Sequence, residues 1–138
     1  MTIRVQAFLL CDSVVIDSQT AKTVIQGVFD KIWANAFPAV HPTCTLYARL
    51  DLGEATGCEF QISVQSPSRL RETPLPAQRV MAQGGTSVAQ LMLQLQSFPL
   101  PEAGTYVFGL IVDGKTLAEY PFTASLLGTS DATVGQVH

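Results

Sequence analysis

Residues 101–114 read Pro-Glu-Ala-Gly-Thr-Tyr-Val-Phe-Gly-Leu-Ile-Val-Asp-Gly, and they contain the strongest structural signals of the sequence. Over 106–112, apolar side chains fall on both faces of an extended strand. Such a strand lies in the middle of a sheet, covered on both faces or in contact with a partner subunit. Asp113 and Gly114 favour a type I′ turn, because both central residues of that turn take positive φ. We therefore predict a central strand and a hairpin to an antiparallel strand over 115–126.

The start of this stretch, Ala-Gly-Thr-Tyr at 103–106, is similar to the tyrosine corner of immunoglobulin-like sandwiches. In that motif a Tyr near the start of a late strand bonds through its hydroxyl to the backbone just upstream. The Cys that follows this Tyr by two residues in antibody domains is Phe108 here. A buried Tyr in any β-domain is the alternative interpretation of Tyr106.

Alternating apolar and polar residues, separated by Gly, Pro and polar turns, predict strands along the rest of the chain. Gly27 indicates a bulge or a close backbone approach, and the polar side of 43–52 is expected to face water. Pro38 and Pro42 predict a crossing loop over 34–42. The predicted strands cover residues 3–16 (with a bulge or a break into two strands at 12–13), 23–33, 43–52, 58–65, 78–83, 88–97, 106–112 and 115–126.

These segments predict an all-β fold, an immunoglobulin-like antiparallel β-sandwich of about eight or nine strands. The length of 138 residues fits one domain. We expect this single β-sandwich domain to cover residues 1–127. The small and polar residues 128–138 are expected to form a disordered C-terminal tail.

The sequence is poor in charge and rich in apolar residues. Charged residues make up 14% of the chain and hydrophobic ones 47%, whereas an average domain has about 25% charged residues. A charge-poor, partly apolar surface favours self-association. We therefore expect a homo-oligomer or a protein partner.

Several partner classes are disfavoured by charge and hydropathy. The net charge is −3 and the eight basic residues are scattered, so nucleic acid is not an expected partner. No run of 18 apolar residues predicts a membrane span, and the N-terminus lacks a signal-peptide layout. Cys11, Cys44 and Cys58 form no CxxC motif and are expected to be buried free thiols. These features favour a cytoplasmic location.

The sequence contains no recognisable catalytic constellation. It has no phosphate-binding loop and no GxSxG elbow. His41 and Cys44 could form a dyad or part of a metal site, and Asp51 with Glu54 could bind a cation. No second set of ligands accompanies either pair, and turn formation explains the acidic residues. We expect no catalytic residue, metal or cofactor, and hence no enzyme.

The weak candidates for ligand binding are Trp33, His41, Arg69 and Arg71. Trp33 could stack on a sugar or a base, although a lone Trp at a strand end is more often a core residue. Arg69 and Arg71 lie in a Pro-rich loop over 66–76. The predicted strand 88–97 has one amide-rich, uncharged face, which could contact another subunit or an extended peptide, or could simply be solvated.

Two groups of residues are similar to an uncharacterised family of short bacterial proteins, a domain of unknown function. The early group is Gly27, Phe29, Asp30, Ile32, Phe37 and Pro38. The late group is Gly104, Tyr106, Phe108, Leu110, Val112, Asp113, Gly114, Pro121 and Phe122. The resemblance covers roughly residues 5–124 and implies a β-sandwich, and it carries no catalytic residue with it.

The sequence alone does not identify a function. The leading hypothesis is a non-enzymatic binding or assembly module that self-associates. The alternative is a β-sandwich that binds a small ligand or a carbohydrate through loops at one end, either 66–76 or 33–41. An enzyme that uses His41 with Cys44 comes third.

Overall fold

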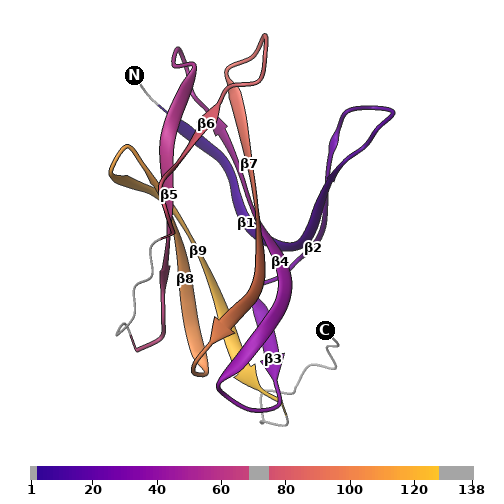
Figure 1. The fold of residues 1–138 in the computed structure, drawn as a ribbon, viewed down its shortest axis with the longest axis vertical. Coiled ribbons are helices and arrows are strands. Elements are labelled where there is room, and N and C mark those ends of the chain that lie inside the picture. Colours follow the sequence, from indigo (N-terminus) through magenta and orange to yellow (C-terminus); the bar gives the residue numbers. More distant parts are fainter. Residues whose placement is uncertain (1–2, 69–74, 128–138) are drawn as a thin grey trace.

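A computed structural model of the chain describes residues 3–68 and 75–127. The described residues form two β-sheets and no helix (Figure 1), which confirms the all-β prediction. The predicted C-terminal tail, 128–138, lies outside the described residues. The strands are β1 (Arg4–Ile16), β2 (Thr23–Val28), β3 (Lys31–Ala34), β4 (Ala39–Asp51), β5 (Gly57–Gln65), β6 (Gln78–Met81), β7 (Val88–Leu100), β8 (Gly104–Val112) and β9 (Lys115–Leu126).

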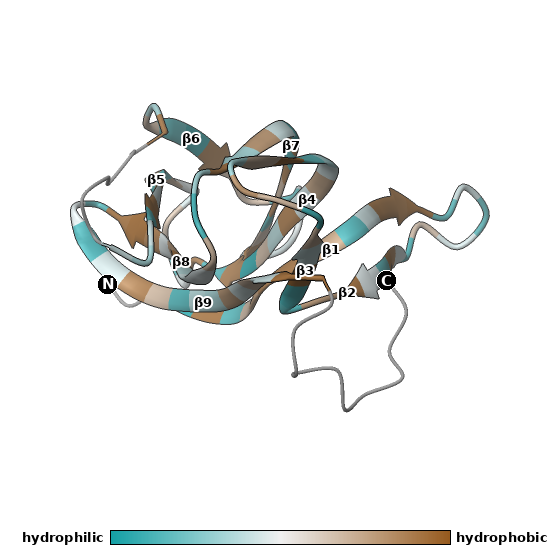
Figure 2. Cartoon of the chain, turned by 90° about the horizontal axis from the view of Figure 1, so that it is seen from below, coloured by the Kyte–Doolittle hydropathy of each residue, from teal (hydrophilic) through white to brown (hydrophobic). Residues whose placement is uncertain are grey.

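The two sheets face each other and enclose the core (Figure 2). Sheet A has the strand order β2-β1-β4-β7, and sheet B has the order β3-β9-β8-β5-β6. Most neighbours pair antiparallel, but β3 pairs in parallel with β9, so the prediction of a purely antiparallel arrangement was wrong for this pair. The parallel pair arises because the chain leaves sheet A after β2 and joins the edge of sheet B.

The predicted central strand is β8, between β9 and β5. Phe108 and Leu110 are fully buried on it. The ring of Phe122 on β9 stacks on both Tyr106 and Phe108, with centroids 5.2 and 5.5 Å apart. Asp113 and Gly114 join β8 to β9 with φ values of 49° and 84°, as the turn prediction requires.

The tyrosine corner is present. The Tyr106 hydroxyl donates a hydrogen bond to the Glu102 carbonyl at 2.7 Å and accepts one from the Glu102 N–H at 3.1 Å. Burial raises the pKa of this hydroxyl, so it stays protonated and able to donate at neutral pH. The bond closes the bend that brings the chain from β7 in sheet A to β8 in sheet B.

The segment predicted as one strand over 23–33 is two strands in different sheets. β2 ends at Val28, and the chain then crosses between the sheets at Phe29 and Asp30. The Phe29 carbonyl accepts a hydrogen bond from the Tyr120 hydroxyl at 2.7 Å, which holds the crossing segment against β9. Gly27 is a site of close approach, as predicted, because a Cβ there would collide with the Asp12 carboxylate.

The crossing loop predicted over 34–42 was too long, because β4 already begins at Ala39. His41 pairs with Phe98 and Thr43 with Gln96, so the strand continues through Pro42. β1 pairs with β4 only from Thr45 onward. Pro42 therefore lies where β4 pairs with β7 alone, and the β4–β7 pairing skips this one position, at which Pro42 has no N–H to donate.

β1 is one continuous strand, without the possible break at 12–13. Beyond Cys11 it pairs only with β2, and residues 12–27 form a hairpin arm that leaves the two-sheet body (Figures 1 and 2). The Thr23 hydroxyl on this arm donates to the Gln90 side-chain oxygen on β7 at 2.8 Å, and the Tyr47 hydroxyl donates to the same oxygen. Thr45 and Tyr47 are buried on the outer face of β4. The prediction that this face meets water was wrong here, because a single-strand pattern does not reveal the arm.

The corner predicts a modest, specific loss of stability for Tyr106→Phe. Removal of the hydroxyl leaves the Glu102 backbone groups without this partner and should lower the free energy of unfolding by about 1 kcal/mol. Urea unfolding measures the change. Phe108→Ala, which opens a cavity beside the same rings, should cost about 3–5 kcal/mol and sets the scale. A Tyr106→Phe variant as stable as the wild type would contradict a stabilising role for the corner.

Candidate functional site

The sequence-predicted candidates Trp33 and His41 lie on different strands and in different sheets. Trp33 is on β3, opposite Ser125 of β9, and is half-buried. Its neighbour Ile32 belongs to the core, so Trp33 faces the other side of sheet B. His41 is on β4 in sheet A. Arg69 and Arg71 lie outside the described residues.

His41 is held in a partly buried place beside Phe29, whose ring centroid is 5.5 Å from the imidazole. Burial lowers the pKa of His41, and the nearby Asp12 carboxylate and the Thr43 backbone raise it by less. The imidazole is therefore mainly neutral at pH 7. A neutral imidazole is a weak partner for an anionic ligand.

The structure does not join His41 and Cys44 into a dyad. Cys44 is 2% exposed and belongs to the hydrophobic core, which His41 does not. Burial, with a smaller effect of Cys11, raises the pKa of the Cys44 thiol to about 11. The thiol is therefore protonated at neutral pH, and a protonated thiol is a poor nucleophile and metal ligand.

The acidic pair Asp51 and Glu54 has a structural explanation in its turn. The Asp51 carboxylate accepts a hydrogen bond from the Gly53 N–H at 2.9 Å, and this bond lowers the pKa of Asp51. Across residues 3–68 and 75–127, His, Cys, Asp and Glu nowhere form a group of three that could hold a metal ion.

An apolar pocket of about 600 Å³ lies at one end of the two sheets. It is bordered by both loop regions that the sequence suggested for ligand binding, through residues 38–40 and through Ser66 and Leu75. Leu75 is held beside β5, because its N–H donates to the Ile62 carbonyl at 2.8 Å and its carbonyl accepts from the Gln61 side chain at 3.1 Å. The remaining border comes from Val64, from residues 94–96 and 98–101, and from Tyr106.

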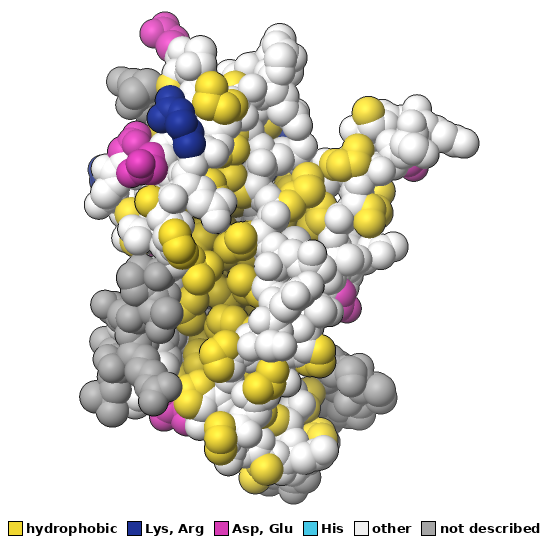
Figure 3. Space-filling view, in the orientation of Figure 1, with side chains coloured by type: hydrophobic (Ala, Val, Ile, Leu, Met, Phe, Trp, Pro, Cys, Tyr) yellow, Lys and Arg dark blue, Asp and Glu magenta, His cyan; other side chains and the backbone are white. Residues whose placement is uncertain are grey.

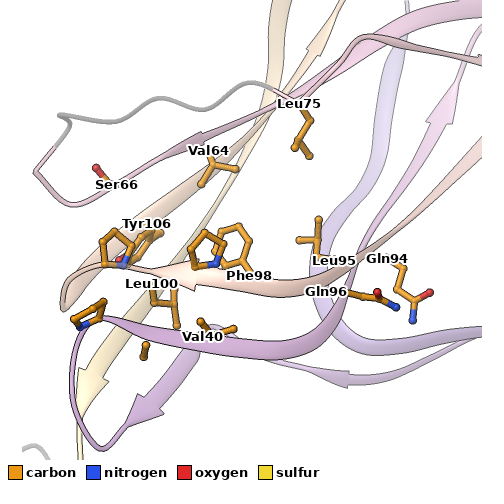
Figure 4. Close-up of a pocket in the computed structure, with 14 residues that line it drawn as sticks. Val40, Val64, Ser66, Leu75, Gln94, Leu95, Gln96, Phe98, Leu100 and Tyr106 are labelled. Atoms are coloured by element: carbon orange, nitrogen blue, oxygen red, sulfur yellow. The ribbon is translucent and has the colours of Figure 1, made fainter.

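The pocket surface consists mainly of carbon. Leu95 and Phe98 extend from β7 towards Val64 on β5 (Figure 4), and none of the bordering residues carries a charge. The Ser66 hydroxyl is buried without a hydrogen-bond partner among the described residues, but its oxygen points away from Phe98 in Figure 4. The pocket is therefore suited to apolar groups.

The pocket opens along the edge of sheet A, which is formed by β7. Figure 3 shows hydrophobic side chains as a band along this face of the molecule. β7 is 13 residues long and contains no Asp, Glu, Lys or Arg. By comparison, the other edge strands are shorter: β2 has six residues, and β3 and β6 have four each and include Lys31 and Arg79.

Natural proteins protect sheet edges with charges, prolines, bulges or short strands, because free N–H and C=O groups recruit other strands. The Ser87 carbonyl accepts a hydrogen bond at 2.7 Å from the N–H of Leu52, the residue that follows β4. The backbone groups of Ser87 therefore face β4. Because backbone groups alternate sides along a strand, those of Gln90, Met92 and Gln94 face the open edge. This part of β7 has no charged side chain and no proline, and its nearest neighbour beyond the edge is β6, whose Gln78 and Arg79 border a small hollow together with residues 90–93.

Sequence reasoning singled out the amide-rich face of 88–97 but not the edge. The pattern of alternation showed which side chains share a face. It did not show that β4 is the only strand paired with β7 among the described residues. The pocket was missed for the same reason, because its walls come from segments that are distant in sequence.

The raised pKa of Cys44 predicts a loss of stability at alkaline pH. The folded thiol has a pKa of about 11 against an ordinary value of 9.0, so folding favours its protonated form. The contribution of this thiol to the free energy of unfolding is complete below pH 9 and is lost as the pH rises towards 11. Urea unfolding at a series of pH values should show this decline. The decline should be shallower in Cys44→Ala, and an equal slope in both proteins would contradict the assignment.

No helix in the described part of the chain is long and apolar enough to cross a membrane. Two solved structures share the fold at low sequence identity. An alkylpurine DNA glycosylase, AlkC, from Pseudomonas fluorescens, bound to DNA with an abasic site analog, aligns with a TM-score of 0.55 and 9% identity. A β-glucosidase from Listeria innocua, in complex with isofagomine, aligns with a TM-score of 0.50 and 10% identity.

These alignments cover 88% and 86% of this chain but only 30% and 16% of the two enzymes, so they show a likeness of fold alone. No curated protein matches the sequence. Residues 6–125 match the model of a family described as a family of unknown function, DUF6941. This match spans both sheets, the tyrosine corner and the open edge at β7. The chain belongs to the DUF6941 family.

Proposed function

We propose that the protein is a non-enzymatic assembly module that self-associates in the cytoplasm. The observation that carries the proposal is the edge strand β7, which is long, uncharged and adjacent to an apolar pocket. Such an edge favours the addition of another strand. The low charged fraction of the whole chain, 14%, also favours self-association.

We also propose that the fold is immunoglobulin-like, and this assignment explains why β7 is an edge. The order β1-β4-β7 corresponds to strands A, B and E, and β9-β8-β5 corresponds to G, F and C, with the tyrosine corner before F. In the constant-type arrangement, strand D lies beside strand E. The described residues include no strand paired with β7 at that position, although β6 lies near β7 and borders a small hollow together with residues 90–93.

The protonated thiols support the absence of thiol catalysis and fit a reducing compartment. Burial raises the pKa of Cys11, Cys44 and Cys58 above the ordinary value, and all three are free. Buried free thiols are typical of cytoplasmic proteins.

Self-association should be visible in solution and should depend on the β7 edge. Sedimentation velocity of the wild type should show a species larger than the 14.8 kDa chain, in an equilibrium that shifts with concentration. Gln94→Pro removes one N–H that faces the open edge and leaves the β4 ladder intact, so it should shift the equilibrium towards the monomer. Gln94→Ala keeps the N–H and is the matched control. A wild type that is monomeric at every accessible concentration would contradict the proposal.

The second candidate function is the binding of a small ligand in the loop-end pocket. The specific observation is the pocket volume of about 600 Å³, within the range of about 300–1,000 Å³ that is typical of small-molecule sites. Its carbon-rich border favours an apolar ligand over a carbohydrate, which needs several hydrogen-bonding groups. Trp33, the residue suggested for sugar stacking, does not border the pocket.

A fluorescent apolar probe tests this candidate. Anilinonaphthalene sulfonate should become fluorescent with the native wild type, and Val64→Phe should weaken this binding several-fold by filling the pocket. Val24→Phe, on the hairpin arm, adds the same aromatic ring elsewhere and should leave the binding unchanged. Circular dichroism verifies that each variant is folded. Equal binding by both variants would place the probe outside the pocket and contradict this candidate.

A further inference from the structure

We propose that two copies of the chain pair through β7, antiparallel and related by a two-fold axis that passes beside Met92. This inference rests on the proposed self-association and names its partner, a second copy, and its register. It assigns no role to any other sheet edge. Three observations carry it: the usable length of the open edge, its sequence symmetry and the chemistry of its two faces.

The usable edge has defined ends. At one end, the backbone of Val88 is already engaged, because its N–H bonds to the Thr86 hydroxyl and its carbonyl accepts from the Gln83 N–H. At the other end, Ser97 has a φ of 51°, which interrupts the regular extended backbone. An incoming strand can therefore pair only with residues 89–96.

Within this edge the sequence is a palindrome. Residues 90–94 read Gln-Leu-Met-Leu-Gln, with Met92 at the centre. An antiparallel pair about a two-fold axis places each residue opposite its mirror position, so Gln90 faces the partner's Gln94 and Leu91 faces the partner's Leu93. The backbone groups of Gln90, Met92 and Gln94 face the open edge, so these positions can form the hydrogen-bonded pairs of the new ladder.

The same register suits both faces of the sheet. Leu91 and Leu93 face the core side, where Leu91 is buried and Leu93 is half-buried. The partner's Leu91 and Leu93 would cover the open side of this row and bury apolar surface. On the outer face, amides meet amides around the 42% exposed Met92.

The absence of charge removes the usual obstacle to self-pairing. In a two-fold pair, a charged residue near the axis would lie close to its own copy, and like charges across strands are destabilising. β7 carries no charged side chain along its whole length. Any strand can pair antiparallel with its own copy, but the symmetry of 90–94 places Gln opposite Gln, Leu opposite Leu and Met opposite Met, so a second copy matches this edge position by position.

Cysteine cross-linking tests the register. Met92→Cys places two thiols opposite each other at the axis, where the separation of paired Cα atoms, roughly 5.5 Å, permits a disulfide. Oxidation with diamide should give a covalent dimer on a non-reducing gel. The native cysteines are at most 3% exposed and should not interfere. Because Met92 is an exposed side chain at the edge, the variant should fold like the wild type.

Two control variants make the result specific. Gln94→Cys exposes a thiol on the same face, but in this register the two copies of Gln94 are four residues apart along the strand, roughly 13 Å, so cross-linking should be at least several-fold slower. Val15→Cys, on the hairpin arm and 48% exposed, measures random collision. Fast cross-linking of Met92→Cys alone supports the proposal.

The other outcomes overturn it. A self-associating wild type in which Gln94→Cys or Val15→Cys cross-links as fast as Met92→Cys would overturn the register while the proposed function stands. A wild type that sediments as a monomer would overturn both. If β7 binds a foreign peptide in place of a second copy, the purified protein would sediment as a monomer. That result would also count against the inference.

Discussion

The contact on which the fold depends is a stack of aromatic rings that β8 and β9 of sheet B direct into the space between the two sheets. Phe122 stacks on Tyr106 and Phe108, and Phe98 of β7 packs against Phe108 and Phe122 with centroids 5.5 and 6.1 Å apart. Large buried rings provide much of the apolar area of a small core. The tyrosine corner sets where this stack begins, because the Tyr106 hydroxyl bonds to the Glu102 backbone at the bend between the sheets.

This aromatic stack also explains the location of the open side. Phe98 reaches the core from the C-terminal part of β7 and anchors that end of the strand to sheet B. Farther along β7, no strand among the described residues pairs with the free edge, and Leu93 and Leu95 are only partly buried. The pocket and the unpaired backbone are thus two aspects of one feature, a two-sheet core left open between β7 and β5.

Parts of the fold could be predicted from local patterns. The central strand, the Asp113–Gly114 turn and the corner each depend on residues within a few positions of one another, so their physical causes are local. The segment over 23–33 misled the prediction because its apolar run continues while the chain changes sheets at Phe29 and Asp30. The burial of Thr45 and Tyr47 was also missed, since it depends on where the hairpin arm lies.

The candidate site was less predictable than the fold. Trp33 and His41 were chosen for their chemistry, yet neither borders the pocket, and burial holds Cys44 as a protonated thiol in the core. The sequence by itself determined that the protein is a charge-poor all-β domain with a tyrosine corner, because alternation and turn chemistry are local properties. Only the tertiary structure decided that β7 is an edge and that the pocket exists. Both depend on which strands become neighbours, and that choice is made by packing across the whole core.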